Sequence, residues 1–170
     1  HRQTIFAFNE GMRMDTDQVL LVSGSCETAF KHEVATLPGV KATTCASSYA
    51  LNFSSNNASA EGPDGVKVSL YQMPVDFEFF RFFGIVPRTG RDFEKSHGAD
   101  RAPGDGELAS RLSLIVNEAA ARQFGFASPD AAIGQIIKAS MASGQISGEI
   151  VGVVPDFSTD SVRRPVAPSV

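Results

Sequence analysis

The first fifty residues alternate apolar runs with positions that favour turns. The run QVLLV at 18–22 is continuously apolar, which is typical of a strand covered on both faces. Residues 26–37 then show helical spacing, with apolar residues on one face: Cys26, Ala29, Phe30, Val34 and Leu37. Pro38-Gly39 should end this helix. We expect residues 40–52 to return as a strand, which completes a βαβ-like unit.

The chain has two cysteines: Cys26 at the start of the predicted helix and Cys45 in the predicted returning strand. The helix would rise about 16 Å from Cys26, and the returning strand would descend about 16 Å to Cys45. Both side chains would therefore end at similar heights, as a disulfide requires. A disulfide also needs facing Cβ atoms, so two buried free thiols remain the alternative.

The polar, Gly/Pro/Asn-rich residues 53–65 predict a loop, and the alternation in VKVSLYQM at 66–73 predicts a half-buried strand. The next stretch, VDFEFFRFFGI at 75–85, holds five of the thirteen phenylalanines. Asp76 is a suitable N-cap and Gly84 suits the left-handed position after a helix, so we expect a short helix over 77–83.

At 100° per residue, three phenylalanines of this helix share one face: Phe79, Phe80 and Phe83. This pattern favours a core helix over a cofactor pocket or a membrane-contacting patch. Phe82 lies at the edge of the face and Phe77 points away from it. These two are our candidates for contact with a partner.

Residues 85–93 look extended with a turn at Gly90, and the charged, Gly-rich residues 94–110 predict a mobile loop. Beyond them, 111–116 predicts a strand, and Asn117 is placed to cap a short helix that ends at Gly125. Ser128-Pro129 begins another capped turn. The strand pair 135–139 and 148–154 completes an α+β (mixed α/β) fold with short elements.

Composition narrows the class of protein. The 170 residues, of which 42% are hydrophobic and 20% charged, suit one domain or two small ones. A net charge of -4 with fifteen scattered Lys and Arg residues disfavours a nucleic-acid partner. No apolar run approaches a membrane span, and the polar start HRQ does not resemble a signal peptide. Both a trimmed ectodomain and a cytosolic domain fit these properties.

The sequence lacks the common catalytic and ligand-binding motifs. SGSCE lacks the second glycine of a nucleophile elbow, and none of the three histidines stands near a nucleophile in the sequence. There is no CxxC spacing for zinc and no phosphate-binding loop. The acids Asp100, Asp105 and Glu107 lack the ligand spacing of an EF-hand, so we expect a solvated acidic loop. No catalytic, cofactor or metal site is predicted, and the chain is not expected to be an enzyme.

Four segments, in this order, carry a family resemblance: VDFEFFRFFGI with GRDF, LIVNEAAARQFGF, SPDAAIGQII, and GEIVGVVPDF with SVRRPVAP. Together they resemble the MacB-like periplasmic core domain of FtsX/MacB-type ABC transporter permeases. The similarity extends over residues 15–170. It implies a porter-like part at 15–93, a mobile connection at 94–107, an inserted sabre-like part at 108–157, and a return segment at 158–170.

The resemblance also implies a function. The domain would lie on the periplasmic side of the inner membrane and would couple ATP-driven motion of the membrane helices to a periplasmic substrate or partner. Its partners would be the transmembrane helices of the permease, a cytoplasmic ATPase subunit, and an adaptor or lipoprotein. No cofactor is implied, and a homodimer is expected only in the full-length permease. The alternatives are an extracytoplasmic ligand-binding or sensor domain of a membrane receptor and, less favoured by the motifs, a small hydrolase.

Within the resembling segments we interpret six residues as architectural: Gly90, Arg91, Asn117, Gly134, Gly152 and Asp156. Gly90 would allow a sharp turn, and Gly134 would allow a backbone conformation that side chains block. Gly152 would allow close approach or a bulge in a strand. Arg91 should pair with a carboxylate, for which Glu118 and Asp156 are the expected partners.

Overall fold

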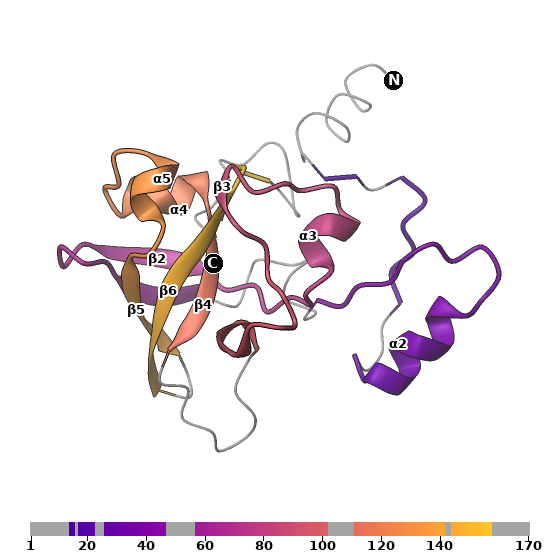
Figure 1. Ribbon diagram of the computed structural model, residues 1–170. Coiled ribbons are helices and arrows are strands. Elements are labelled where there is room, and N and C mark those ends of the chain that lie inside the picture. The colour runs from indigo at the N-terminus through magenta and orange to yellow at the C-terminus, as the bar shows by residue number, and fades with distance from the viewer. Residues whose placement is uncertain are drawn as a thin grey trace.

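The computed structural model describes residues 14–15, 17–22, 26–46, 57–101, 111–141 and 144–157 (Figure 1). Its elements, in chain order, are α2 (Thr28–Ala35), β1 (Asn57–Glu61), β2 (Lys67–Tyr71), α3 (Phe79–Phe82), β3 (Thr89–Gly90), the 3-10 helix η3 (Gly98–Asp100), β4 (Leu112–Asn117), α4 (Glu118–Gln123), α5 (Pro129–Ala132), β5 (Ile136–Met141) and β6 (Gly144–Val154).

One six-stranded mixed sheet organises the described residues. Its strands follow the order β2-β1-β5-β6-β3, and β4 pairs with β6. β4 runs parallel to β6, whereas the other pairs are antiparallel. The α+β class and the strand pair near the C-terminal end are thereby confirmed. β1 lies inside the segment that we expected to be a loop, so that prediction was wrong for residues 57–61.

Local signals set the helices of the second half. The Asn117 side chain accepts a hydrogen bond of 2.9 Å from the Ala120 amide and begins α4. Gly125 follows α4 with a φ of 84°. Ser128 caps α5 through the Ala131 amide, and Pro129 occupies its first turn. These caps agree with the sequence predictions.

The first hydrophobic cluster lies between the sheet and the helices α4 and α5, which cover one face in Figure 1. The sheet contributes Leu70, Ile137, Ile150 and others, and the helices contribute small alanines and Phe124. The alanines let α4 and α5 approach the strands closely, and Phe124 fills the remaining space. The most buried part of the domain is therefore the face beneath α4 and α5.

The second cluster lies on the other face of the sheet, around α3. It comprises Met14, Phe79, Phe80, Phe83, Ile85, Ile115, Val154 and Phe157. Phe79 is 0% exposed and contacts Phe83 with ring centroids 5.0 Å apart. The predicted aromatic core helix is confirmed, although it is shorter than expected and its N-cap residue is Glu78 in place of Asp76. Gly84 follows α3 with a φ of 66°, as predicted.

A β-bulge in β6 allows one strand to serve both clusters. The parallel register pairs Leu114 with Ile150 but Ile115 with Gly152, so Val151 is the extra residue. Ile150 and Val153 belong to the first cluster, and Val154 belongs to the second. In a regular strand, residues 150 and 153 would face opposite sides. The bulge therefore restores the apolar match between β4 and β6.

The predicted βαβ unit at the start of the chain is not formed. Residues 18–22 form no strand, and Leu20 is 84% exposed. Residues 40–45 are not part of a strand, and only Ala46 makes an isolated bridge, to Val75. The rest of the predicted return, 47–52, lies outside the described residues. A continuous apolar run forms a strand only where a partner strand satisfies its backbone, and the described part of the chain supplies none here.

The helix of this unit is present, but its expected burial is not. α2 spans Thr28–Ala35 and contains no buried residue. On the predicted apolar face, Phe30 is 44% and Leu37 is 55% exposed. Gly39 follows with a φ of 88°, so the Pro38-Gly39 stop is confirmed. In Figure 1, α2 lies beyond α3, away from the sheet.

The sheet joins strands from both sides of the 94–107 connection. β1 and β2 precede this connection, yet β1 pairs with β5, which follows it. β3, at the end of the 15–93 part, pairs with β6. The division into porter-like and sabre-like parts stays a prediction, while the hydrogen-bonded sheet spans the predicted boundary. Residues 102–110 and 158–170 lie outside the described structure.

Candidate functional site

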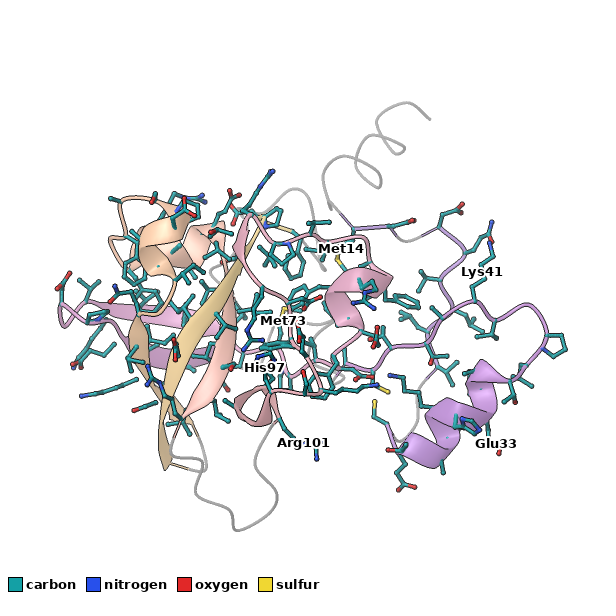
Figure 2. All side chains as sticks on the ribbon, viewed as in Figure 1. Met14, Glu33, Lys41, Met73, His97 and Arg101 are labelled. Atoms are coloured by element: carbon teal, nitrogen blue, oxygen red, sulfur yellow. The ribbon has the colours of Figure 1, made fainter. Side chains whose placement is uncertain are left out.

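A cleft of about 1210 Å³ separates α2 from the sheet face that carries the second cluster. Lys31 and His32 of α2 line one wall, and Phe77, Phe93 and others line the opposite wall. Figure 2 shows Met73 and Arg101, two further lining residues, between α2 and the sheet. The lining is mostly apolar, and its polar members include Lys31, His32 and Asp76.

An ion pair crosses this cleft from α2. Lys31 Nζ contacts the Asp76 carboxylate, and both side chains are largely buried. The second Asp76 oxygen accepts a hydrogen bond of 2.7 Å from the Phe77 amide. The Asp76 amide in turn donates to the Cys45 carbonyl oxygen at 2.9 Å. Asp76, expected as a helix cap, therefore links α2, the segment around Cys45 and the start of the aromatic helix.

The two cysteines are free thiols in the structure, with Cys26 exposed and Cys45 partly buried. Burial, together with the interaction with the neighbouring Cys26 side chain, raises the pKa of Cys45 to about 11. Both cysteines line the same cleft, although the strand at 40–45 on which the comparison of heights rested is not formed. A covalent bond between them stays a prediction.

Arg91 pairs with Asp100 and not with Glu118 or Asp156, so the expected partners were wrong. Its Nη1 and Nη2 atoms donate to the two Asp100 oxygens at 2.5 and 2.8 Å. The Asp100 side chain is 0% exposed, so the expected solvated acidic loop was wrong for Asp100, while Asp105 and Glu107 lie outside the described residues. Glu118 instead lies 3.7 Å from Arg88. The Arg91–Asp100 pair fixes η3 against the residues that follow β3.

The environment of Asp100 favours the carboxylate form strongly. Burial alone would raise the pKa of Asp100, but hydrogen bonds from Arg91, the Ser113 side chain and the Glu94 amide outweigh it and lower the pKa to about 2. The same pair raises the pKa of Arg91. The neighbouring Asp92 shows the opposite shift, since burial raises its pKa. Asp100 is thus a fully paired structural anion, and the polar, Gly-rich sequence around it gave no signal of this burial.

Asp156 and Asn117 meet at the beginning of α4. Asp156 Oδ1 accepts a hydrogen bond of 2.6 Å from the Ala119 amide, beside the Asn117 cap on Ala120. Its other oxygen lies 2.6 Å from Arg122 Nη2. A carboxylate at this end also interacts favourably with the helix dipole. The residues that follow β6 are thereby fastened to α4, and Phe157 enters the second cluster.

Gly90 and Gly152 face each other where β3 crosses β6. A Cβ on Gly90 would lie 2.2 Å from the Val151 carbonyl oxygen, and one on Gly152 would lie 2.3 Å from the Arg91 carbonyl oxygen. Gly90 also has a φ of 77°. Both glycines permit the close backbone approach that we predicted for Gly152. Gly90 lies within β3, whereas we had expected a sharp turn at this residue.

Gly134 stands at the entry to β5. Its φ is 79°, and its amide donates to the Ile150 carbonyl oxygen at 2.8 Å. An added Cβ would meet little there, since its nearest neighbour is a side-chain oxygen of Glu149 at 3.9 Å. The requirement for glycine at this position is therefore conformational.

The two candidate contact residues, Phe77 and Phe82, are both partly buried. Phe77 lines the cleft, and Phe82 packs on Phe83 with ring centroids 4.9 Å apart. Neither is well exposed, so a role for them in partner contact stays a prediction.

The described ranges contain no group of three or more His, Cys, Asp or Glu side chains that could hold a metal ion. Over those same ranges, no helix has both the length and the apolar character needed to cross a membrane. The candidate residues described above form ion pairs, helix caps and a close approach of two strands.

Solved structures with a similar fold exist. A domain described as part of a permease protein from Porphyromonas gingivalis superposes with a TM-score of 0.53 and 19% identity, covering 81% of this chain and 52% of that one. The chain therefore shares the fold of that domain, as the sequence resemblance implied. Neither a family model nor a curated protein sequence matches the chain.

Two further structures are similar at lower scores. The extracellular domain of the noncanonic ABC-type transporter YknZ from Gram-positive bacteria has a TM-score of 0.49 and 14% identity, covering 84% of this chain and 59% of that one. The periplasmic region of MacB from Actinobacillus actinomycetemcomitans has a TM-score of 0.48 and 13% identity, covering 78% and 51%. The chain thus spans between about half and three fifths of the length of the structures it matches.

Proposed function

We propose that this chain is a non-catalytic, extracytoplasmic domain of an ABC transporter permease. The observation that carries the proposal is the shared fold with the permease domain from Porphyromonas gingivalis over 81% of the chain. The ordered sequence segments that resemble MacB-type permeases support it independently. In this setting the domain lies on the periplasmic side of the inner membrane, joined to the transmembrane helices of its permease.

The domain's role is to carry motion. A cytoplasmic ATPase subunit moves the membrane helices, and the domain transmits that motion to a periplasmic substrate, adaptor or lipoprotein. The fold suits this role because its segments are fastened to one another by buried or capped polar contacts, such as Arg91–Asp100 and Asp156 on α4. Such contacts let connected elements move as a unit.

The location can be tested on the full-length protein in its membrane. A single cysteine introduced as Leu20→Cys, with Cys26 and Cys45 changed to serine, presents a thiol at a position that is 84% exposed. A membrane-impermeant maleimide should label it in intact spheroplasts. The matched control is a single cysteine on the ATPase, which should react only after lysis. Labelling of Leu20→Cys only after lysis would contradict an extracytoplasmic position.

The coupling role needs a second measurement on the same variant. In the purified complex of permease and ATPase, the labelling rate of Leu20→Cys should differ between the nucleotide-free and ATP-bound states, because the domain moves with the membrane helices. Replacing the catalytic base of the ATPase should hold the complex at the ATP-bound rate. A rate that never responds to ATP would favour the alternative, a ligand-binding or sensor domain.

A further inference from the structure

Helix α2 is attached to the rest of the domain without a hydrophobic core of its own. None of its eight residues is buried. Phe30 within the helix and Leu37, two residues beyond its end, are both exposed. An isolated helix of this length is unstable in water. Its position must therefore depend on a few specific ties.

The Lys31 contact of α2 leads to one short segment, which contains Cys45 and Ala46. Lys31 pairs with Asp76, and the Asp76 amide donates to the Cys45 carbonyl oxygen. Ala46 forms a β-bridge with Val75, which holds this segment to the residues that lead into α3. Cys45 is thus fixed to the part of the body that α2 contacts.

Cys26 completes this arrangement from the helix side. It stands two residues before α2 begins, and both cysteines line the same cleft. The Cys26 side chain also contributes to the raised pKa of Cys45, as neighbouring side chains do. Two neighbouring thiols on segments held by other contacts need little movement to bond.

We propose that Cys26 and Cys45 form an intramolecular disulfide that fastens α2 across the cleft. The proposal rests on the proposed function only for its compartment, since an extracytoplasmic setting supplies small-molecule and protein disulfides as oxidants. The reaction is thiol–disulfide exchange. The two thiols lose two protons and two electrons, one S–S bond forms between them, and the S–S bond of the oxidant is reduced to two thiols.

The environments of the two sulfur atoms set the order of the steps. Cys26 is exposed, so its thiolate attacks the oxidant first and forms a mixed disulfide, releasing one thiol. Cys45 then displaces the second thiol from Cys26. Burial raises the pKa of Cys45, which disfavours its thiolate as the first attacker.

The test uses the purified 170-residue chain and oxidised glutathione. The expected product is a monomer that has lost both reactive thiols and 2 Da in mass. Trypsin cleavage after Lys31 and Lys41 should leave the peptide that contains Cys26 joined to the peptide that contains Cys45 until a reductant is added. A transient glutathione adduct on Cys26 should precede this product, and Cys45→Ser should accumulate that adduct permanently.

Hydrogen exchange of the α2 amides supplies a structural readout. Closing the loop from Cys26 to Cys45 should raise their protection by about 100-fold relative to the reduced chain. The Cys26→Ser variant should match the reduced chain under both conditions. Thiols that remain fully alkylated after oxidation, a persistent glutathione adduct on the unsubstituted chain, or a disulfide only between two chains would each overturn the proposal. None of these outcomes bears on the proposed function, which is tested by labelling at Leu20→Cys.

Discussion

Arg91 holds Asp100 through two nearly parallel hydrogen bonds of 2.5 and 2.8 Å, and the Asp100 side chain has 0% exposure. A bidentate arginine–carboxylate pair is among the strongest polar contacts in proteins. Here it joins the residues after β3 to η3, next to Ser113 of β4. The pair therefore fixes the start of the 94–107 connection on the sheet.

Replacing Asp100 with asparagine should destabilise the domain by about 3 kcal/mol, because the Arg91 guanidinium loses its buried charge partner. The measurement is the free energy of unfolding in urea. Glu94→Gln is the matched control, since the Glu94 side chain is 57% exposed and its change should stay within about 0.5 kcal/mol. Equal effects of the two substitutions would show that the Arg91–Asp100 pair is not special.

The stability should also depend on pH through Asp100. Its pKa in the folded chain is about 2, below the ordinary 3.8, so the carboxylate stabilises the fold above pH 4 and this contribution is lost as the pH falls toward 2. The loss should reach roughly 2 kcal/mol. Burial raises the pKa of Asp92, so Asp92 changes stability in the opposite direction. Asp92 is present in both proteins, and its effect therefore cancels in their difference. The difference in unfolding free energy between the unsubstituted chain and Asp100→Asn should therefore shrink between pH 4 and pH 2. A constant difference would contradict this assignment.

Gly90→Ala should cost more than about 3 kcal/mol, because its Cβ would meet the Val151 carbonyl oxygen at 2.2 Å in addition to the strain of a φ of 77°. Gly39→Ala separates the two effects. Gly39 has a φ of 88° with nothing within 4 Å of an added Cβ, so only the backbone strain of about 1 kcal/mol applies. Chemical denaturation of both variants measures the contrast. Similar losses would mean that β3 can move away from β6 at little cost.

Phe79→Ala should destabilise the domain by about 4 kcal/mol, since Phe79 is 0% exposed at the centre of the second cluster. Phe30→Ala removes the same side chain from α2, where it is 44% exposed, and should cost less than about 1 kcal/mol. Thermal unfolding followed by circular dichroism compares the two. A large loss in Phe30→Ala would indicate that the exposed face of α2 is covered in solution.

The second half of the fold could be predicted because its signals are local. Asn117 and Ser128 accept hydrogen bonds from amides three residues further on, and Pro129 has the backbone angle of a first helical turn. None of these effects depends on distant partners. The aromatic helix could be predicted for the same reason, since its phenylalanines define one face at helical spacing.

The first half could not be predicted equally well, because its apolar runs are ambiguous without their partners. Residues 18–22 match a buried strand in pattern, yet a strand exists only where another chain segment pairs with it. The ion-pair partner of Arg91 could not be predicted for the same reason. Asp100 lies in a polar, Gly-rich segment, and its burial follows from the packing of η3 on β4, which residue types alone do not reveal.

The arrangement around β6 has a mechanical consequence. β5 and β3 pair along one side of this eleven-residue strand, and β4 pairs along the other. Tension applied through Phe157 would act along β6, at nearly right angles to the bonds with β5 and β3 and at a slant to those with β4. The bonds would share such a load in shear instead of opening one after another, so the strand can pass a pull from its end to the whole sheet.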